Sequence, residues 1–344
     1  MYICKMEQIE FIRDFAGLGN RLQAYLSGAL DVPDLDQAIA HSLGANPWYT
    51  SYCIKERLSS IVQGYLLAPK LQSWLTNYPD VWYAYQKDIT VVMAGNIPLV
   101  GFHDYLSVLA SGRTVSVKLS SKDAFLLPAL HRLLCSFAPA WSYRLRYVLE
   151  VPVDTHGLIA TGSDATAAWF TARYPHLPQI VRRHRVSVAV LSADIRQEQI
   201  SGLQRDMFAY FGLGCRSVVR LFVPKEFDLM RLTVFEQCPD EASHLGFRNA
   251  YRRQKALLTL QGASFTDGGF FLLQPKEDLF PPVATVFYSV YTCINEVIDF
   301  LEANDSRLQS VVGMVGGFKN CINFGCSQSP QLWDYADGID TMRL

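Results

Sequence analysis

One cysteine of the chain stands in a setting that suits nucleophilic chemistry. Cys215 follows two glycines in the sequence FGLGCRS at 211–217. A cysteine thiol has a pKa of about 8.5, so only a small fraction is thiolate near neutral pH, and activation requires backbone dipoles or a nearby cation. Arg216 and Arg220 are candidate cations. The alternative is a buried structural cysteine, because this residue type is among the most often buried.

The other cysteines form neither a metal-binding nor a disulfide pattern. They stand at positions 4, 53, 135, 238, 293, 321 and 326. A zinc site needs four ligands at suitable spacing, and no Cys/His pair follows Cys321 and Cys326. Scattered cysteines in a long chain are typical of reduced thiols. We therefore expect no metal site and a cytoplasmic protein.

Strands and helices are predicted to alternate from residue 88 onward. A β-branched run at 89–94 stops at Gly95 as a buried strand would, and a helix at 99–110 and a strand at 114–118 complete a βαβ unit. Asp123 is expected to cap a helix reaching about residue 137. Strands at 147–151 and 157–163 and a helix at 164–174 follow. This alternation predicts a mostly parallel sheet that binds ligands at the carboxyl ends of its strands.

Helices and strands are also predicted outside residues 88–174. An amphipathic stripe at 54–66 predicts a helical, structural region over the first 85 or so residues. Strands are expected at 186–191 and 218–223, a helix at 195–211, and a basic helix around 248–255 in a second α/β segment. No internal repeat is visible, and a second domain is expected to begin near Asp206.

Composition excludes several classes of protein. The 344 residues are 50% hydrophobic and 18% charged, which is typical of globular proteins. A net charge of −1 gives no drive toward nucleic acid. The acidic residues within 1–10 do not fit a secretory signal, and the longest apolar candidate, 281–301, is interrupted by Asn295, Glu296 and Asp299. We expect neither a nucleic-acid partner nor a membrane span.

Several segments, in order, resemble those of the aldehyde dehydrogenase superfamily over residues 88–344. GNIPL at 95–99 resembles its NFPL turn, GRTVSVK at 112–118 its GNTVVVK strand, and TGS at 161–163 its TGS turn. Cys215, with Gly212 before and Arg220 after it, resembles the catalytic cysteine. DLFPPV at 278–283 is similar to the EIFGPV segment. The sequences FGLGCRS and LWDYADG (332–338) look most like the fatty acyl-CoA reductases, relatives of the fatty-acid reductase subunit of bacterial bioluminescence.

This resemblance implies an aldehyde-dehydrogenase-like α/β fold. It implies a helical N-terminal region and a Rossmann-type dinucleotide-binding domain over 1–205, and a smaller α/β domain with the catalytic cysteine over 206–307. Residues 308–344 would form a C-terminal return and oligomerisation segment. We expect a homo-oligomer with this tail in or near the interface, because the tail carries Phe318, Phe324, Trp333 and Tyr335.

The resemblance also assigns site residues. Cys215 is the implied nucleophile, and the Asn96 amide, with the backbone N–H of Cys215, is implied to donate to the substrate oxyanion. The implied cofactor contacts are Lys118, Ser121, Lys122, Gly162, Ser163, Asp278 and Phe280. From the residues alone the alternatives stay open. Asn96 also suits a turn, Lys118 a solvent-facing strand end, and Gly162 and Ser163 a plain helix cap, although a helix N-terminus also suits a pyrophosphate.

Two departures from the family pattern bear on the reaction. Hydrolysing members have an ELGGK segment whose carboxylate activates water, and this chain has RRHRVS at 182–187. Ser121 stands where NAD-preferring members have a glutamate, so no charge there repels a 2′-phosphate.

We therefore expect NADPH-dependent reduction, with NADH as the alternative donor, of a fatty acyl thioester such as acyl-CoA to the aldehyde through an acyl-cysteine. An acyl-protein synthetase or acyltransferase partner would fit this reaction. The rival functions are a hydrolytic aldehyde dehydrogenase and a non-catalytic nucleotide-binding subunit of an acyl-transfer complex.

Overall fold

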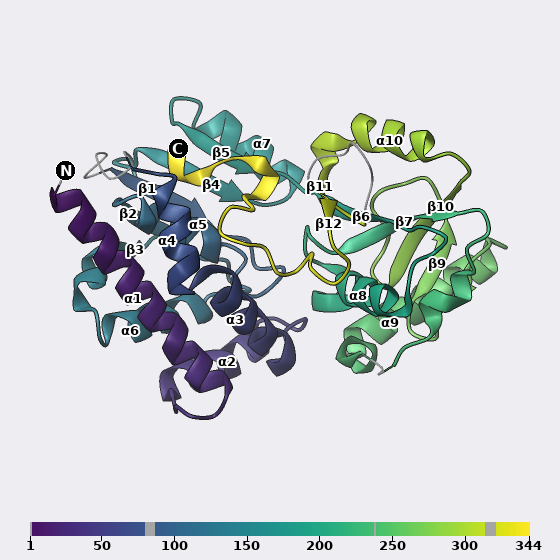
Figure 1. Ribbon diagram of the computed structural model, residues 1–344, viewed down its shortest axis with the longest axis horizontal. Helices are drawn as coiled ribbons and strands as arrows, with labels where there is room; N and C mark the ends of the chain where they lie inside the picture. The colour runs from purple at the N-terminus through teal and green to yellow at the C-terminus, as the bar shows by residue number, and fades with distance from the viewer. Residues whose placement is uncertain (1, 80–86, 237–238, 314–320) are drawn as a thin grey trace. The chain divides into compact units, whose positions relative to one another are not determined.

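The computed structural model describes residues 2–79, 87–236, 239–313 and 321–344, with side chains from residue 8 onward (Figure 1). It divides into two compact units. The first comprises Met1–His184 and Ser329–Leu344, and the second comprises Arg185–Gln328. Among the described residues, no helix is both long and apolar enough to cross a membrane.

The N-terminal part of the first unit is helical, as expected. It consists of α1 (Tyr2–Leu26), α2 (Pro33–Ala45), α3 (Ser51–Tyr65) and α4 (Ala68–Thr76). The predicted stripe in α3 is buried, with Ile54, Leu58 and Ile61 fully enclosed. Thr50 caps α3, because its hydroxyl accepts the Cys53 N–H at 3.1 Å.

The first sheet has the strand order of a dinucleotide-binding fold. It contains β1 (Asp88–Val92), β2 (Thr114–Lys118), β3 (Leu145–Tyr147), β4 (Gly157–Thr161) and β5 (Gln179–Arg182), all parallel, in the order β3-β2-β1-β4-β5. The helices α5 (Phe102–Ala110), α6 (Leu126–Cys135) and α7 (Asp164–Arg173) and the 3-10 helix η2 (Pro139–Tyr143) lie in the connections between these strands. The strand order reverses between β1 and β4, and the carboxyl edge at that point is where open α/β sheets bind ligands.

The end of the chain packs into the first unit. Its 3-10 helices are η7 (Ala336–Gly338) and η8 (Thr341–Arg343). The Tyr335 hydroxyl accepts the Trp74 indole N–H at 2.7 Å and lies 2.7 Å from the Tyr78 hydroxyl. Buried Arg182 donates to the Asp104 carboxylate at 2.5 Å and to the Thr341 hydroxyl at 3.2 Å. The last residues, in yellow in Figure 1, are thus held to β5 and α5.

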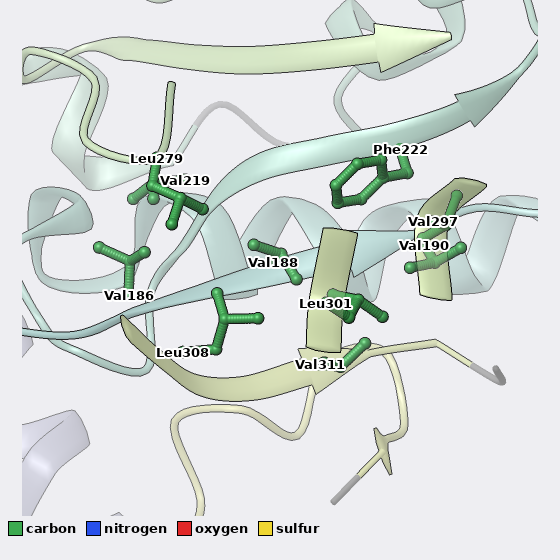
Figure 2. Packing of buried hydrophobic residues seen from close by; sticks show 10 residues of the cluster. All are labelled: Val186, Val188, Val190, Val219, Phe222, Leu279, Val297, Leu301, Leu308 and Val311. Carbon is green, nitrogen blue, oxygen red and sulfur yellow. The ribbon is translucent and has the colours of Figure 1, made fainter. Parts of the chain in front are cut away.

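The second unit contains a seven-stranded sheet. Its strands are β6 (Val186–Val190), β7 (Val218–Pro224), β8 (Thr266–Asp267), β9 (Leu272–Pro275), β10 (Thr285–Tyr291), β11 (Leu308–Val312) and β12 (Cys321–Ile322), in the order β12-β11-β6-β7-β10-β9-β8. Its helices are α8 (Gln197–Phe208), α9 (Leu245–Leu260) and α10 (Ile294–Ala303), with 3-10 helices η3 (Ala209–Gly212), η4 (Leu229–Thr233), η5 (Asp240–Ser243) and η6 (Asp305–Arg307). Figure 2 shows the valines of β6 packed with Val297 and Leu301 of α10 and with Leu308 of β11.

The division between the units differs from the expected domain boundaries. A boundary at 205/206 falls inside α8, whereas the compact units divide at 184/185. The reason is strand pairing, since β6 forms hydrogen bonds with β7 and β11 of the second sheet. For the same reason β11 belongs to the second unit, and the return to the first unit begins at Ser329. Phe318 of the expected tail lies outside the described residues.

Candidate active site

Cys215 lies on a tight turn between η3 and β7 in the second unit, and its side chain is half-buried. The turn is closed by a hydrogen bond from the Ser217 N–H to the Gly214 carbonyl at 3.0 Å. Ser187 of β6 is fully buried, and its hydroxyl donates to the Cys215 carbonyl at 3.1 Å. The backbone that carries the thiol is therefore fixed by a neighbouring strand, while the side chain is not fully enclosed.

The residues just before this turn have an unusual backbone conformation. Tyr210, Phe211 and Gly212 have φ values of 56°, 61° and 71°. The left-handed region costs a non-glycine residue roughly 1–2 kcal/mol and persists where the surrounding packing imposes it. The Phe211 ring supplies such packing, with its centroid 4.5 Å from the His244 ring and 5.9 Å from the Phe247 ring. Strain of this kind is concentrated at functional sites.

Arg220 does not have the expected place beside the thiol. Its side chain is 1% exposed, and its guanidinium donates to the carbonyls of Lys276 at 2.6 Å and Asp278 at 2.8 Å and to the Ser289 hydroxyl at 2.7 Å. Burial lowers its pKa to about 10. Arg220 therefore holds the loop between β9 and β10, and these contacts do not make it an activating cation for Cys215.

That loop carries Asp278 and Phe280, two of the implied cofactor residues. The Asp278 carboxylate is exposed and accepts the Leu279 N–H at 2.8 Å, which with nearby Lys276 lowers its pKa. The half-buried Phe280 ring lies beneath the Arg307 guanidinium, 4.9 Å from its centroid. Both residues thus lie in the second unit, on a loop whose backbone is fixed by Arg220.

Asn96 lies on the loop that follows β1 in the first unit, and it is exposed. Gly95 beside it is buried, and a Cβ there would meet Ser120 Oγ at 2.6 Å and Lys122 Cβ at 3.1 Å. The position therefore requires glycine. The loops after β1 and β2 consequently touch, with Asn96 at the surface of the carboxyl edge of the sheet.

The three residues expected near the adenosine ribose follow or end β2. Lys118 is half-buried at the end of the strand, and Ser121 and Lys122 are exposed in the next turn. Residues 118–122 include no carboxylate, and the next residue, Asp123, is 7% exposed. The exposed side chains of this turn therefore carry an ammonium group and a hydroxyl group.

Gly162 and Ser163 lie between β4 and α7. Ser163 is the N-cap of α7, and its hydroxyl accepts the Thr166 N–H at 3.3 Å. A Cβ at Gly162 would meet Thr166 Cγ2 at 2.8 Å, so the backbone passes close to the helix. The helix-cap interpretation is confirmed. It leaves other N–H groups of the first turn of α7 for an anion.

The structure corrects the role expected of Asp123. It does not cap a helix, because α6 begins at Leu126 after Phe125, which makes no side-chain cap. The Asp123 carboxylate instead accepts the Leu99 N–H at 2.7 Å. Burial raises the pKa of Asp123 to about 7.

Two further residues of the N-terminal region hold the same loop, and sequence analysis missed both. Asn46 is buried, and its amide donates to the Gly95 carbonyl at 3.0 Å. Arg57 of α3 is buried and donates to the Leu99 carbonyl at 3.4 Å. Arg57 lies within an otherwise apolar stripe, and this was the one signal in the sequence that it has a buried partner.

No protein-family model and no curated protein matches the sequence. Solved structures do match. Aldehyde dehydrogenase 21 from Physcomitrella patens, in complex with the reaction product succinate, aligns over 93% of this chain and 79% of its own, with a TM-score of 0.64 and 11% identity. An oxidoreductase from Marinobacter aquaeolei aligns over 95% and 79%, with a TM-score of 0.65 and 12% identity.

A Mycobacterium tuberculosis aldehyde dehydrogenase complexed with NAD+ aligns over 88% of this chain and 72% of its own, with a TM-score of 0.58 and 16% identity. At such identities the likeness shows the fold. The chain has the α/β fold of the aldehyde dehydrogenases, with parallel sheets and a helical N-terminal region, which confirms the expected fold class.

Proposed function

We propose that this protein reduces a fatty acyl thioester, such as an acyl-CoA, to the aldehyde with NADPH, through an acyl intermediate on Cys215. The observation that carries the proposal is the setting of Cys215. A half-buried thiol lies on a closed turn that follows three left-handed residues, and Ser187 fixes its carbonyl. This setting occurs in a chain with the aldehyde dehydrogenase fold.

The chain's own residues act on the acyl group in two stages. The Cys215 thiolate attacks the thioester carbonyl carbon, the bond to the CoA sulfur breaks, and the released thiolate takes up a proton. The Asn96 amide and the Cys215 N–H stabilise the oxyanion at each stage. NADPH, when bound, supplies the hydride that reduces the acyl group. Collapse of the resulting thiohemiacetal forms the aldehyde and releases Cys215 as thiolate.

Residues 182–187 favour reduction over hydrolysis of the acyl intermediate. Hydrolysis needs a base that activates water, and this segment has no carboxylate. Arg182 is buried in an ion pair with Asp104, and Arg185 donates to the Leu308 carbonyl at 2.9 Å. Both side chains therefore have structural partners.

The first unit fits a nicotinamide dinucleotide at the carboxyl edge of its sheet. The strand order reverses at β1 and β4, and the close approach at Gly162 brings backbone to the start of α7. Lys118, Ser121 and Lys122 would hold the adenosine ribose and its 2′-phosphate, and Gly162 and Ser163 the pyrophosphate. Asp278 and Phe280 would be further cofactor contacts.

The acyl donor is a soluble thioester or the acyl-enzyme of a synthetase or acyltransferase partner. The reaction requires that Cys215 stay reduced, which suits the cytoplasm. We propose that the enzyme is a homo-oligomer.

The proposal is tested by NADPH oxidation with a panel of acyl-CoAs. Wild-type protein should produce aldehyde, and Cys215→Ala should produce none while keeping the wild-type melting temperature. Cys293→Ala and Cys326→Ala remove exposed thiols and should retain full activity. If Cys215→Ala retains more than a small fraction of turnover, the assignment is wrong. Formation of acid in place of aldehyde would identify the hydrolytic rival.

A further inference from the structure

A buried polar cluster lies beneath the loop that carries Asn96. Its members are Asn46, Tyr49 and Arg57 from the N-terminal region and Asp123 from the turn after β2, with exposed fractions of 2%, 5%, 6% and 7%. Burying a polar side chain costs free energy unless it is hydrogen-bonded, and a hydrogen-bonded buried cluster makes the surrounding backbone more rigid. The reaction described above gives no role to any of the four.

Three of these residues fix the backbone of the loop at both ends. Asn46 binds the Gly95 carbonyl, Arg57 binds the Leu99 carbonyl, and Asp123 Oδ2 accepts the Leu99 N–H. Leu99 has a φ of 52°, a conformation that a leucine adopts only when its surroundings impose it. The bond from its N–H to a carboxylate is of the stronger, charge-assisted kind.

We propose that Asp123 is a positioning residue, which holds the loop 95–99 so that the Asn96 amide is presented at the carboxyl edge of the sheet. This inference rests on the proposed function of Asn96. The α-helical N-terminal region thereby contributes to the site, because Asn46 and Arg57 act on the same loop. Asp123 itself is not assigned any contact with substrate.

The ionised state of Asp123 matters to this role. Its other oxygen, Oδ1, and the Tyr49 hydroxyl are both buried within this cluster. Tyr49 and Arg57 are the titratable groups that act on Asp123, and the loop itself contributes the Leu99 N–H. Burial raises the pKa of Asp123 to about 7, so the carboxylate that accepts best from Leu99 forms as the pH rises through neutrality.

The test compares Asp123→Ala and Asp123→Asn with wild type and with the control Asp31→Asn, an exposed aspartate. Hydrogen exchange of the peptide 95–101 is measured at pH 8, together with kcat, KM and the melting temperature. Asp123→Ala should exchange faster at Leu99 and lose about tenfold or more in kcat, with KM for NADPH within about threefold. Asp123→Asn keeps an acceptor oxygen and should be affected less.

Two readouts distinguish positioning from a merely structural role. Burial disfavours the ionised form of Asp123, so the native state loses stability as the pH rises from the pKa of the unfolded chain toward 7. Asp123→Asn carries no such charge and should therefore melt no lower than wild type at pH 8. Wild-type kcat should rise with pH through about 7, and Asp123→Asn should lack this step.

Unchanged exchange at Leu99 in folded Asp123→Ala, or unchanged kcat, would overturn the inference. If Asp123→Ala does not fold, Asp123→Asn decides through the pH step, whose persistence in that variant would also overturn it. If wild-type protein reduces no acyl thioester, the proposed function fails, and the exchange data alone still decide whether Asp123 holds the loop.

Discussion

At the scale of single residues, Asn96 is exposed, although the backbone on both sides of it is buried and hydrogen-bonded. Gly95 is pressed against the loop after β2, and Leu99 is bonded through both its N–H and its carbonyl. Truncating the Asn96 side chain leaves these backbone hydrogen bonds in place.

We expect Asn96→Ala to lower kcat by about 10² through loss of an oxyanion donor. The melting temperature and KM for NADPH should change little, since the backbone contacts remain. Asn77→Ala, which removes an exposed amide on the end of α4, serves as the control and should be fully active. A fall in kcat of less than about threefold would contradict the assignment of Asn96.

Cofactor preference is set by the charges near the turn after β2. Residues 118–122 include two lysines and no carboxylate, so their positive charge should attract a 2′-phosphate. We expect kcat/KM with NADPH to exceed that with NADH by about tenfold, which corresponds to roughly 1.4 kcal/mol.

The variant Ser121→Glu should reverse this preference, because a carboxylate favours two ribose hydroxyls and repels a phosphate. Ser142→Glu places the same charge at an exposed site in η2 and should leave the ratio unchanged. If wild-type kcat/KM is about the same with NADPH and NADH, Ser121 and Lys122 are wrongly assigned to the cofactor site. A clear wild-type preference for NADH would contradict the electrostatic argument.

At the scale of elements, Arg220 links β7 to the loop between β9 and β10. Its guanidinium satisfies two loop carbonyls and lies between the rings of Phe222 and Phe300, 4.9 Å and 4.6 Å from their centroids. A buried arginine with this many partners is a structural anchor. The position of Asp278 and Phe280 depends on it.

Arg220→Met should lower the free energy of unfolding by about 2–4 kcal/mol. Two carbonyls lose their hydrogen-bond donor, because the buried guanidinium is replaced by a side chain that cannot donate. The free energy of unfolding of Arg220→Lys should lie between those of wild type and Arg220→Met, since a lysine cannot reproduce the planar guanidinium. Urea unfolding measures both, with exposed Arg253→Met as a control expected within about 0.5 kcal/mol of wild type. Unchanged stability in Arg220→Met would contradict the anchoring role.

Strands and helices with strong patterns were predictable, and buried polar partners were not. The β-branched run at 89–94 and the stripe of α3 correspond to β1 and α3, because periodicity reports burial directly. The expected strand at 147–151 is wrong in its bounds, since β3 ends at Tyr147. Asp123 and Arg220 were assigned wrong roles because their partners, Leu99 and the loop at 276–278, are set by tertiary packing.

At the scale of the whole molecule, the chain forms two units, each with its own mainly parallel sheet. Their boundary could not be read from the sequence, because β6 has the same buried pattern whichever sheet it joins. The C-terminal tail was expected to need covering by a partner. Its Leu332 and Tyr335 are covered by the chain itself, whereas Trp333 and Ile339 are 51% and 43% exposed.

We expect a homodimer or larger assembly with these two exposed side chains in or near the interface. Light scattering at micromolar concentration should give at least about twice the 38.7 kDa of the single chain. Trp333→Arg should shift the mass toward that of the monomer, because it places a charge in an apolar contact. A monomeric wild-type protein would contradict this prediction.

The central claim is that Cys215 carries the acyl group, and mass spectrometry tests it most directly. Wild-type protein mixed with a long-chain acyl-CoA in the absence of NADPH should gain the mass of one acyl group, located on the peptide that contains Cys215. Addition of NADPH should remove the adduct and release one equivalent of aldehyde. Cys215→Ala should gain no such mass. Turnover to aldehyde without any adduct on Cys215, or an adduct that resides on another residue and is converted to aldehyde, would contradict the account.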